Sequence, residues 1–426
     1  YYKYMSKVSK VWARQILDSR GLPTVETVVQ LDTGHTAVAS VPGGTSTGTY
    51  ECVDLRDNDP ANYDGKGVSK AVKNVNETLG PGIWGLDSTD QAAIDKRLID
   101  LDGSKNKSKF GANAILSISA ANSKAAAMAQ NTSLYAWTNT LAKRAGINAA
   151  LKVPTPVFNM INGGLHGAGN LDFQEFHVIP ATSKNYSEAL KIGVEVYITL
   201  GKNLERRGAI HSVGDEGGYA PNLFTNADAL EVLFESIKET TYQIGRDVFL
   251  GLDVAASVFY KNGNYTIRDK STPLSDDALI DYYKYLNSQY HMSHIEDPLH
   301  EDAWASWKKL YESFQGQLTV VGDDLLVTNT ERVEKAIAEK ACDAILVKPN
   351  QVGTVWETLL VVKRAREANW KVITSHRSGE TNDWFIADFA VGIGSDFVKF
   401  GAPARGERVA KYNRLLSIEA ELASAK

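Results

Sequence analysis

The 426-residue sequence contains only two cysteines, Cys52 and Cys342, and they lie far apart. This small number argues against a disulfide framework and against a cysteine-based metal site. We therefore expect two reduced, buried thiols. No apolar run approaches the roughly 20 residues that a membrane span requires, and no signal-peptide hydrophobic region follows the N-terminus. We therefore expect a cytoplasmic protein that does not associate with membranes and whose native start is Met5, after four preceding residues.

Clusters of one charge sign are also missing. Lysine and arginine total 46, aspartate and glutamate total 51, and the net charge of -5 is spread along the chain. This distribution argues against a nucleic-acid partner. A small anionic substrate would need local positive charge or a bound metal ion. The hydrophobic fraction of 43% is ample for a sizeable core, and the length is typical of two domains.

The first part of the chain has strand patterns followed by helix patterns. Three apolar or alternating runs between residues 8 and 41 are separated by turn residues, which predicts an antiparallel meander. A loop rich in glycine, serine and threonine, PGGTSTG, follows at 42–48. Helical periodicity then appears in three segments: 68–79, 91–101 and 113–130. This order predicts a small α+β domain, which we assign to residues 5–145.

From residue 146 to 426 the pattern changes to alternating strands and helices. Strand-like segments at 153–159 and 175–179 precede a long helical stretch at 186–207. Six more apolar runs follow, at 249–253, 293–297, 318–324, 344–348, 371–376 and 396–400, mostly with amphipathic helices between them. This alternation predicts parallel strands joined by crossover helices and closed into a TIM-like (β/α)8 barrel, so the predicted class is α/β.

These apolar runs end in polar residues of catalytic type: Asp253, Glu296, Asp323 with Asp324, Lys348, His376 and Lys399. In a barrel of parallel strands the C-terminal ends share one face, so these side chains are expected to converge on one pocket. Taken singly, each has a plainer interpretation. An aspartate after a strand commonly caps the next helix, and a lysine at a strand end usually reaches solvent.

Three converging carboxylates favour a metal site. Without a cation, Asp253, Glu296 and Asp323 would repel one another and raise each other's pKa. A ligand set made only of oxygen favours Mg2+. A lysine beside such a cation has its ammonium form disfavoured, which makes Lys348 a candidate base for proton abstraction. A lysine base with Mg2+ stabilising an ene-diolate is a known arrangement for removing a proton next to a carboxylate.

Further segments supply candidate acids and anion ligands. The turn VGDEGG presents Glu216 as a candidate general acid, although an exposed acidic turn is an equally good interpretation. His166 and Glu175 lie near the first barrel strands and could reach the same pocket. Arg377 and Ser378 stand at a strand-to-helix turn, where a guanidinium and backbone N–H groups could hold a phosphate.

Ten motifs in order along the chain resemble the enolase family from about residue 6 to residue 422. They are SRGLPTVE (19–26), GGTSTG (43–48), QEF (174–176), GDEGG (214–218), GLD (251–253), IEDP (295–298), GDDL (322–325), LVKPNQ (346–351), SHRSGET (375–381) and KFGAPARGER (399–408). The resemblance implies an enolase-type barrel that carries the active site, preceded by the smaller domain. It also implies reversible dehydration of 2-phospho-D-glycerate to phosphoenolpyruvate in glycolysis and gluconeogenesis, with two Mg2+ per site.

The resemblance also implies a role for each site residue. Asp253, Glu296 and Asp323 match the ligands of the first Mg2+, and Ser46 matches the loop ligand of the second. Lys348 matches the base that removes the C2 proton, Glu216 the acid that assists departure of the C3 hydroxyl, and Glu175 and His166 the residues that support it. The expected substrate-binding residues are Lys399 for the carboxylate, Arg377 and Ser378 for the phosphate, and His376 and Gln174.

Two other functions remain open from the sequence alone. One is a related dehydratase that acts on a non-phosphorylated acid. The other is a non-catalytic scaffold or surface-binding protein on the same fold. The resemblance further implies a homodimer or a larger homo-oligomer.

Overall fold

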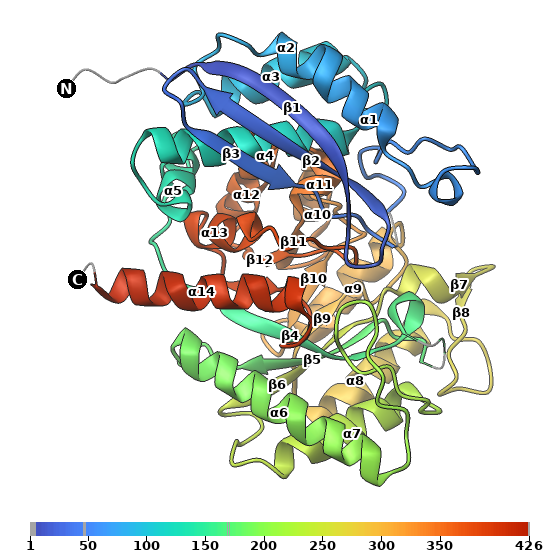
Figure 1. Cartoon of the computed structure of the whole chain (residues 1–426). Coiled ribbons are helices and arrows are strands. Elements are labelled where there is room, and N and C mark those ends of the chain that lie inside the picture. The colour runs from blue at the N-terminus through green and yellow to red at the C-terminus, as the bar shows by residue number, and fades with distance from the viewer. Residues whose placement is uncertain (1–5, 46–47, 168, 170, 425–426) are drawn as a thin grey trace.

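The computed structural model describes residues 6–45, 48–167, 169 and 171–424, and Figure 1 shows the whole chain. The predicted start at Met5 and the loop residue Ser46 both lie outside the described residues. No helix in the described part of the chain is long and apolar enough to cross a membrane.

The N-terminal part is an antiparallel meander backed by helices, as the pattern predicts. Strands β1 (Val8–Leu17), β2 (Pro23–Leu31) and β3 (Thr36–Ser40) pair in the order β1-β2-β3. The helical segments are η1 (Tyr63–Gly65), α1 (Ser69–Asn74), the π-helical η2 (Val75–Leu79), α2 (Gly80–Gly82), α3 (Gln91–Asp102), α4 (Ala112–Ala129) and α5 (Leu134–Arg144). Figure 1 shows α4 lying along the sheet, and a 2.6 Å hydrogen bond between the hydroxyls of Thr27 and Ser117 joins the two.

The second part of the chain is a closed barrel of eight strands. Around the barrel they are β10 (Thr319–Gly322), β11 (Ala344–Val347), β12 (Lys371–Ser375), β13 (Phe397–Lys399), β4 (Thr155–Asn162), β5 (Glu175–Pro180), β6 (Val248–Asp253) and β9 (Met292–Glu296). The longer helices around it are α6 (Tyr186–Arg206), α7 (Asn226–Lys238), α8 (Asp276–Tyr290), α9 (Trp304–Phe314), α10 (Thr330–Glu339), α12 (Val355–Glu367), α13 (Phe385–Gly392) and α14 (Gly406–Ser424). The short elements are η3 (Gly164–His166), η4 (Ala256–Phe259), β7 (Tyr260–Lys261), β8 (Asn264–Tyr265) and α11 (Pro349–Val352). The predicted division between residues 145 and 146 stays a prediction.

One feature of the barrel differs from the sequence prediction. Strand β5 runs antiparallel to both of its neighbours, β4 and β6, whereas we expect parallel strands throughout. The chain between β4 and β5 contains only the short turn η3, and so short a connection reverses the chain instead of crossing over. The start of β5, and not its end, therefore lies at the same face as the C-terminal ends of the other strands. Glu175 accordingly pairs in register with Asp253.

The interior of the barrel is apolar below that face. Alternate residues on the strands point inward, where a compact cluster contains Val157, Ile179, Val321, Ala344, Leu346, Ile373 and Phe397. Burial of each large apolar side chain contributes about 1.5–3 kcal/mol to folding. The apolar layer therefore supports the polar strand ends with a packed core directly beneath them.

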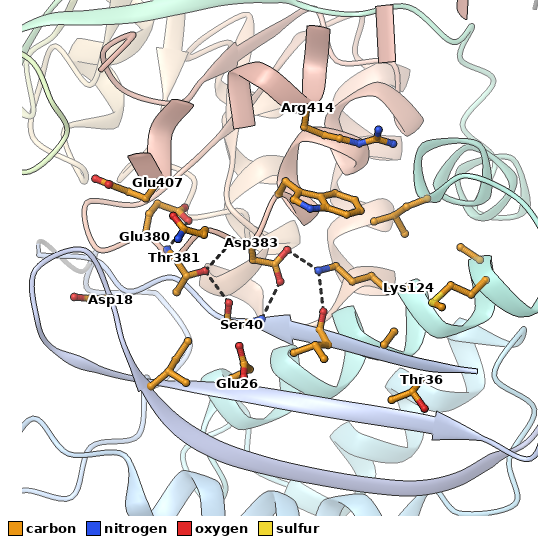
Figure 2. Close-up of a pocket in the computed structure, with 18 of the residues that line it drawn as sticks. Asp18, Glu26, Thr36, Ser40, Lys124, Glu380, Thr381, Asp383, Glu407 and Arg414 are labelled. Carbon is orange, nitrogen blue, oxygen red and sulfur yellow. Dashed lines mark hydrogen bonds and ion pairs between the residues drawn. The ribbon is translucent and has the colours of Figure 1, made fainter. Parts of the chain in front are cut away.

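A large cleft separates the meander from the barrel (Figure 2). The Lys124 ammonium of α4 donates to the Asp383 carboxylate at 2.6 Å and to the Val38 carbonyl at 2.9 Å. Asp383 also accepts from the Ser40 backbone N–H at 2.9 Å. These contacts join the two parts of the chain along one wall of the cleft.

Candidate active site

A small cavity lies at the barrel face where the strands end. It is lined by Gly44, His166, Gln174, Glu175, Glu216, Asp253, Lys348, Ser375, His376, Arg377, Ser378 and Lys399. The structure therefore gathers most of the predicted site residues around one space. The predicted ligands Glu296 and Asp323 join them through the two lysines, as the distances below show. Ser46 lies outside the described residues, so its predicted role is not tested.

The Lys399 ammonium lies at the centre of the carboxylates. Its Nζ is 3.0 Å from Asp253 Oδ2, 2.9 Å from Glu296 Oε1 and 3.3 Å from Glu175 Oε2. Burial disfavours the ammonium form, but the surrounding carboxylates outweigh burial and hold the pKa of Lys399 well above its ordinary value. Asp253 and Glu296 end adjacent strands in register, which explains why both reach this amine.

Lys348 points into the cavity from the turn between β11 and α11. The residue has extended backbone angles (φ -128°, ψ 101°), and Pro349 occupies the first position of the short helix, where a proline is favoured. The turn directs the Lys348 Nζ to Asp323 Oδ2 at 2.5 Å. Burial lowers the lysine pKa, but Asp323 outweighs it, and the pKa of Lys348 is raised. The sequence argument expects a disfavoured ammonium, so Asp323 must be neutralised before this amine can act as a base.

The donor set fits a divalent cation. Of the three predicted ligands, Asp323 has carboxylate oxygens within 4.8 Å of those of Asp297 and Asp324, and Asp253 and Glu296 stand side by side on adjacent strands. Burial and Asp253 together hold the pKa of Glu296 well above its ordinary value. This shift reflects electrostatic repulsion among the buried acids. The side-chain oxygen of Gln174 is buried without a hydrogen-bond partner among the described residues. Hard oxygen donors in such excess are the ligands that Mg2+ prefers.

Four side chains that line the cavity form an acid–imidazole network: His166, Glu175, Glu216 and His376. His166 Nδ1 lies 3.4 Å from Glu175 Oε1 and 3.5 Å from Glu216 Oε1. Glu216 also accepts a 3.1 Å hydrogen bond from the Asn159 amide. Burial and Glu175 raise the pKa of Glu216, but His376 and His166 outweigh them and lower it to about 2. Burial lowers the pKa of His166, yet Glu216 and Glu175 leave it raised. The neighbouring carboxylates therefore favour the protonated form of His166.

Arg408 of α14 fixes the orientation of His376. The guanidinium lies 2.6 Å from His376 Nδ1, and an arginine can only donate, so Nδ1 accepts and the imidazole carries its proton on Nε2. That Nε2 lies 3.1 Å from Glu216 Oε2. Arg408 also donates to the carbonyls of Arg377, Ser378 and Asp215. One buried guanidinium thus ties together two loops of the cavity.

The predicted phosphate ligands are covered by the N-terminal loop. The Arg377 guanidinium donates to both carboxylate oxygens of Glu51, at 3.0 and 3.2 Å. Ser378 Oγ accepts from the Thr45 backbone N–H at 2.7 Å. Gly43 and Gly379 exchange two 2.8 Å backbone hydrogen bonds. The loop therefore docks onto the turn, and the guanidinium is already oriented to bind anionic oxygens.

The sequence argument does not identify four residues that shape the site. They are Glu51, Asn159, Gln351, whose amide donates to Asp323 Oδ1 at 3.2 Å, and Arg408. Gln351 and Arg408 fall inside two of the ten family motifs, so the motifs hold a signal for them. The sequence carries no local signal for Glu51 and Asn159, because these residues reach the site only through tertiary packing.

Comparison with known families agrees with this architecture. The family described as "Enolase, N-terminal domain" matches residues 8–138. The family described as "Enolase, C-terminal TIM barrel domain" matches residues 150–426. Together the two matches cover the meander, its helices as far as the first part of α5, and the entire barrel. The chain belongs to the enolase family.

Proposed function

We propose that this protein is a phosphopyruvate hydratase, which reversibly dehydrates 2-phospho-D-glycerate to phosphoenolpyruvate in glycolysis and gluconeogenesis. The observation that carries this proposal is the composition of one cavity. A candidate base (Lys348), a candidate acid network (Glu216 with His166) and a candidate phosphate ligand (Arg377) all line it. Proton abstraction next to a carboxylate needs the base, and departure of the hydroxyl as water needs the acid. The phosphate ligand selects a phosphorylated substrate.

In this proposal Lys348 accepts the C2 proton. Its position at the helix start fixes the direction of the amine, and Asp323, which also accepts a hydrogen bond from the Gln351 amide, holds the amine from one side. Lys399 would bind the substrate carboxylate, because its ammonium already contacts three carboxylates at about the same point. Mg2+ held by Asp253, Glu296 and Asp323 would neutralise the negative charge that develops on that carboxylate.

Glu216 and His166 would deliver a proton to the departing C3 hydroxyl. Despite burial, the two histidines lower the pKa of Glu216 to about 2, so Glu216 would have to receive that proton from His166 first. Against the effect of burial, Glu216 and Glu175 raise the pKa of His166, which favours its imidazolium form as the source of that proton. Glu175, which faces His166, would hold that imidazolium in place.

Arg377 and Ser378 would select for a phosphorylated substrate. A phosphate could take the position that the Glu51 carboxylate holds on the guanidinium, because both present two oxygens to the same fork. The proposed partners are therefore 2-phosphoglycerate and phosphoenolpyruvate, with Mg2+ as cofactor. A homodimer or larger homo-oligomer in the cytoplasm remains part of the proposal on the strength of family membership.

The test is to incubate the purified protein with Mg2+ and 2-phosphoglycerate and follow the absorbance of the enol product. We expect product formation that depends on both components. D-glycerate, which lacks the phosphate, serves as the matched substrate and should give none. Turnover of D-glycerate but not of 2-phosphoglycerate would instead indicate a dehydratase of non-phosphorylated acids. Turnover of neither would indicate a binding or scaffold protein.

A further inference from the structure

Directly below the cavity, the inner face of β5 carries a histidine. Strand alternation places Glu175, His177 and Ile179 on the same face. Glu175 lines the cavity, and Ile179 belongs to the apolar cluster of the barrel interior. His177 therefore lies between the polar and apolar layers, where it is 1% exposed.

His177 contacts a site carboxylate and no solvent. Its Nε2 lies 2.8 Å from Glu175 Oε2. An ionised carboxylate can only accept, so Nε2 carries the proton and donates it. The second oxygen, Oε1, remains directed towards His166 at 3.4 Å. A hydrogen bond from below thus fixes one carboxylate oxygen and leaves the other facing the cavity.

The second group near Glu175 Oε2 is the Lys399 ammonium, which also contacts other acids. The Lys399 ammonium is 3.3 Å from this oxygen but closer to Asp253 and Glu296. Under the proposed function, Lys399 also binds the substrate carboxylate, which weakens its hold on Glu175. We propose that His177 is a positioning residue that holds Glu175 in the orientation needed for the proton-delivery half of the reaction.

His294 supplies a matched control in the same barrel interior. In strand register, Gly251 lies between His177 and His294, and a Cβ built on it would be 3.5 and 3.4 Å from their Cβ atoms. His294 is also buried, but its Nδ1 contacts the Ser293 hydroxyl at 2.9 Å and its ring packs edge-on against Phe397. Among the described residues it makes no hydrogen bond to a cavity side chain. The two histidines share burial and differ in that one contact.

The inference rests on the proposed function and is tested with His177→Leu, His294→Leu and His177→Gln. We expect His177→Leu to lower kcat by about 10- to 100-fold with little change in KM, because it removes a hydrogen bond to a charged group. Exchange of the C2 hydrogen of 2-phosphoglycerate with solvent, which depends on Lys348, should continue near the wild-type rate. His177→Gln, whose amide can donate from a similar position, should restore most of kcat. His294→Leu should stay within about 3-fold of wild type.

Other outcomes overturn the proposal. Equal losses in both leucine variants, or a parallel loss of C2 exchange in His177→Leu, would indicate a packing defect. If wild-type protein neither forms product nor exchanges C2, the proposed function fails. The positioning role is then judged by NMR of 15N-histidine protein. A protected imidazole N–H signal that His177→Leu removes and Glu175→Gln shifts supports it. No such signal, or one unaffected by Glu175→Gln, contradicts it.

Discussion

The interdomain cleft and the cavity at the barrel face show that size does not indicate where the chemistry lies. The cleft has a volume of about 900 Å³ and the cavity about 20 Å³. In the cleft, every acidic side chain that lines it has a basic partner within 4 Å: Asp18 with Arg20, Glu26 with Arg14, Glu380 with Lys411, Asp383 with Lys124, and Glu407 with Arg408. Its charges are balanced.

At the barrel face the charges are not balanced. The acids there are Glu51, Glu175, Glu216, Asp253, Glu296, Asp297, Asp323 and Asp324, and the bases paired with them are fewer: Lys348, Arg377, Lys399 and, beside Glu216 and Glu175, His166. Crowding so many buried carboxylates destabilises the fold unless a cation or protonation compensates for their charge. The imbalance therefore favours this cavity, and not the larger cleft, as the candidate functional site.

Removing the metal ion should have the largest effect on the function that distinguishes the cavity from the cleft. EDTA should abolish turnover and lower the thermal unfolding temperature, because Asp253, Glu296 and Asp323 then repel one another. Added Mg2+ should restore both. EDTA saturated with Mg2+ beforehand serves as the control. Full activity in EDTA would show that the acid cluster needs no cation.

Replacing the candidate base should have the next largest effect. Lys348→Met should lower kcat by about 10²- to 10⁴-fold, because the C2 proton then has no acceptor. Circular dichroism should show an unchanged fold. A kcat within a few-fold of wild type would mean that another group removes the proton.

Arg408→Lys should have an intermediate effect. A lysine cannot reproduce the fork that donates to His376 Nδ1 and to the Arg377 and Ser378 carbonyls. We expect about a 10-fold loss of kcat and a loss of about 1–3 kcal/mol in the free energy of unfolding. Chemical denaturation and the product assay measure the two effects. An unchanged kcat would show that the loops keep their positions without this residue.

Lys124→Met in the cleft should hardly affect turnover. It leaves Asp383 without its basic partner, so we expect a loss of about 1–3 kcal/mol in the free energy of unfolding. We expect kcat within about 3-fold of wild type. A loss comparable to that of Lys348→Met would erase the functional distinction between the two regions.

Replacing Asp95 should change the free energy of unfolding and not turnover, and the change should depend on pH. Burial raises its pKa to about 7, although it accepts hydrogen bonds from Gln91 and from the Trp356 backbone N–H. Because the folded pKa exceeds the unfolded value, the folded state retains a proton that the unfolded state releases. This contribution to stability is greatest below about pH 4 and is lost as the pH rises towards 7. Between about pH 5 and 7, wild type should lose about 2–3 kcal/mol relative to Asp95→Asn, measured by denaturation. Parallel pH profiles would contradict the raised pKa.

The strand ends could be predicted from the sequence because the residues themselves mark them. Asp253, Glu296, Lys348 and Lys399 each follow an apolar run, and barrel closure brings such ends together. The direction of β5 could not be predicted, since a short loop and a crossover look alike when the intervening residues carry no clear helical period. The glycine-containing segment before Gln174 is of that kind.

Residues that reach the site from other elements were harder to predict. Glu51 follows the N-terminal loop, and its pairing with Arg377 depends on how that loop docks. Arg408 extends from α14, and nothing in local periodicity shows that its side chain is fully buried. His177 looks like one residue of an ordinary buried strand until its contact with Glu175 is seen. Long-range packing, and not local pattern, places these groups.

The central claim is that Lys348 removes the C2 proton of 2-phosphoglycerate within the charge-imbalanced cavity. Hydrogen exchange at C2 in deuterated water, followed by NMR, tests that step without requiring completion of the dehydration. We expect Mg2+-dependent exchange in wild type and in Lys124→Met, and none above background in Lys348→Met. Exchange at the wild-type rate in Lys348→Met would contradict the claim.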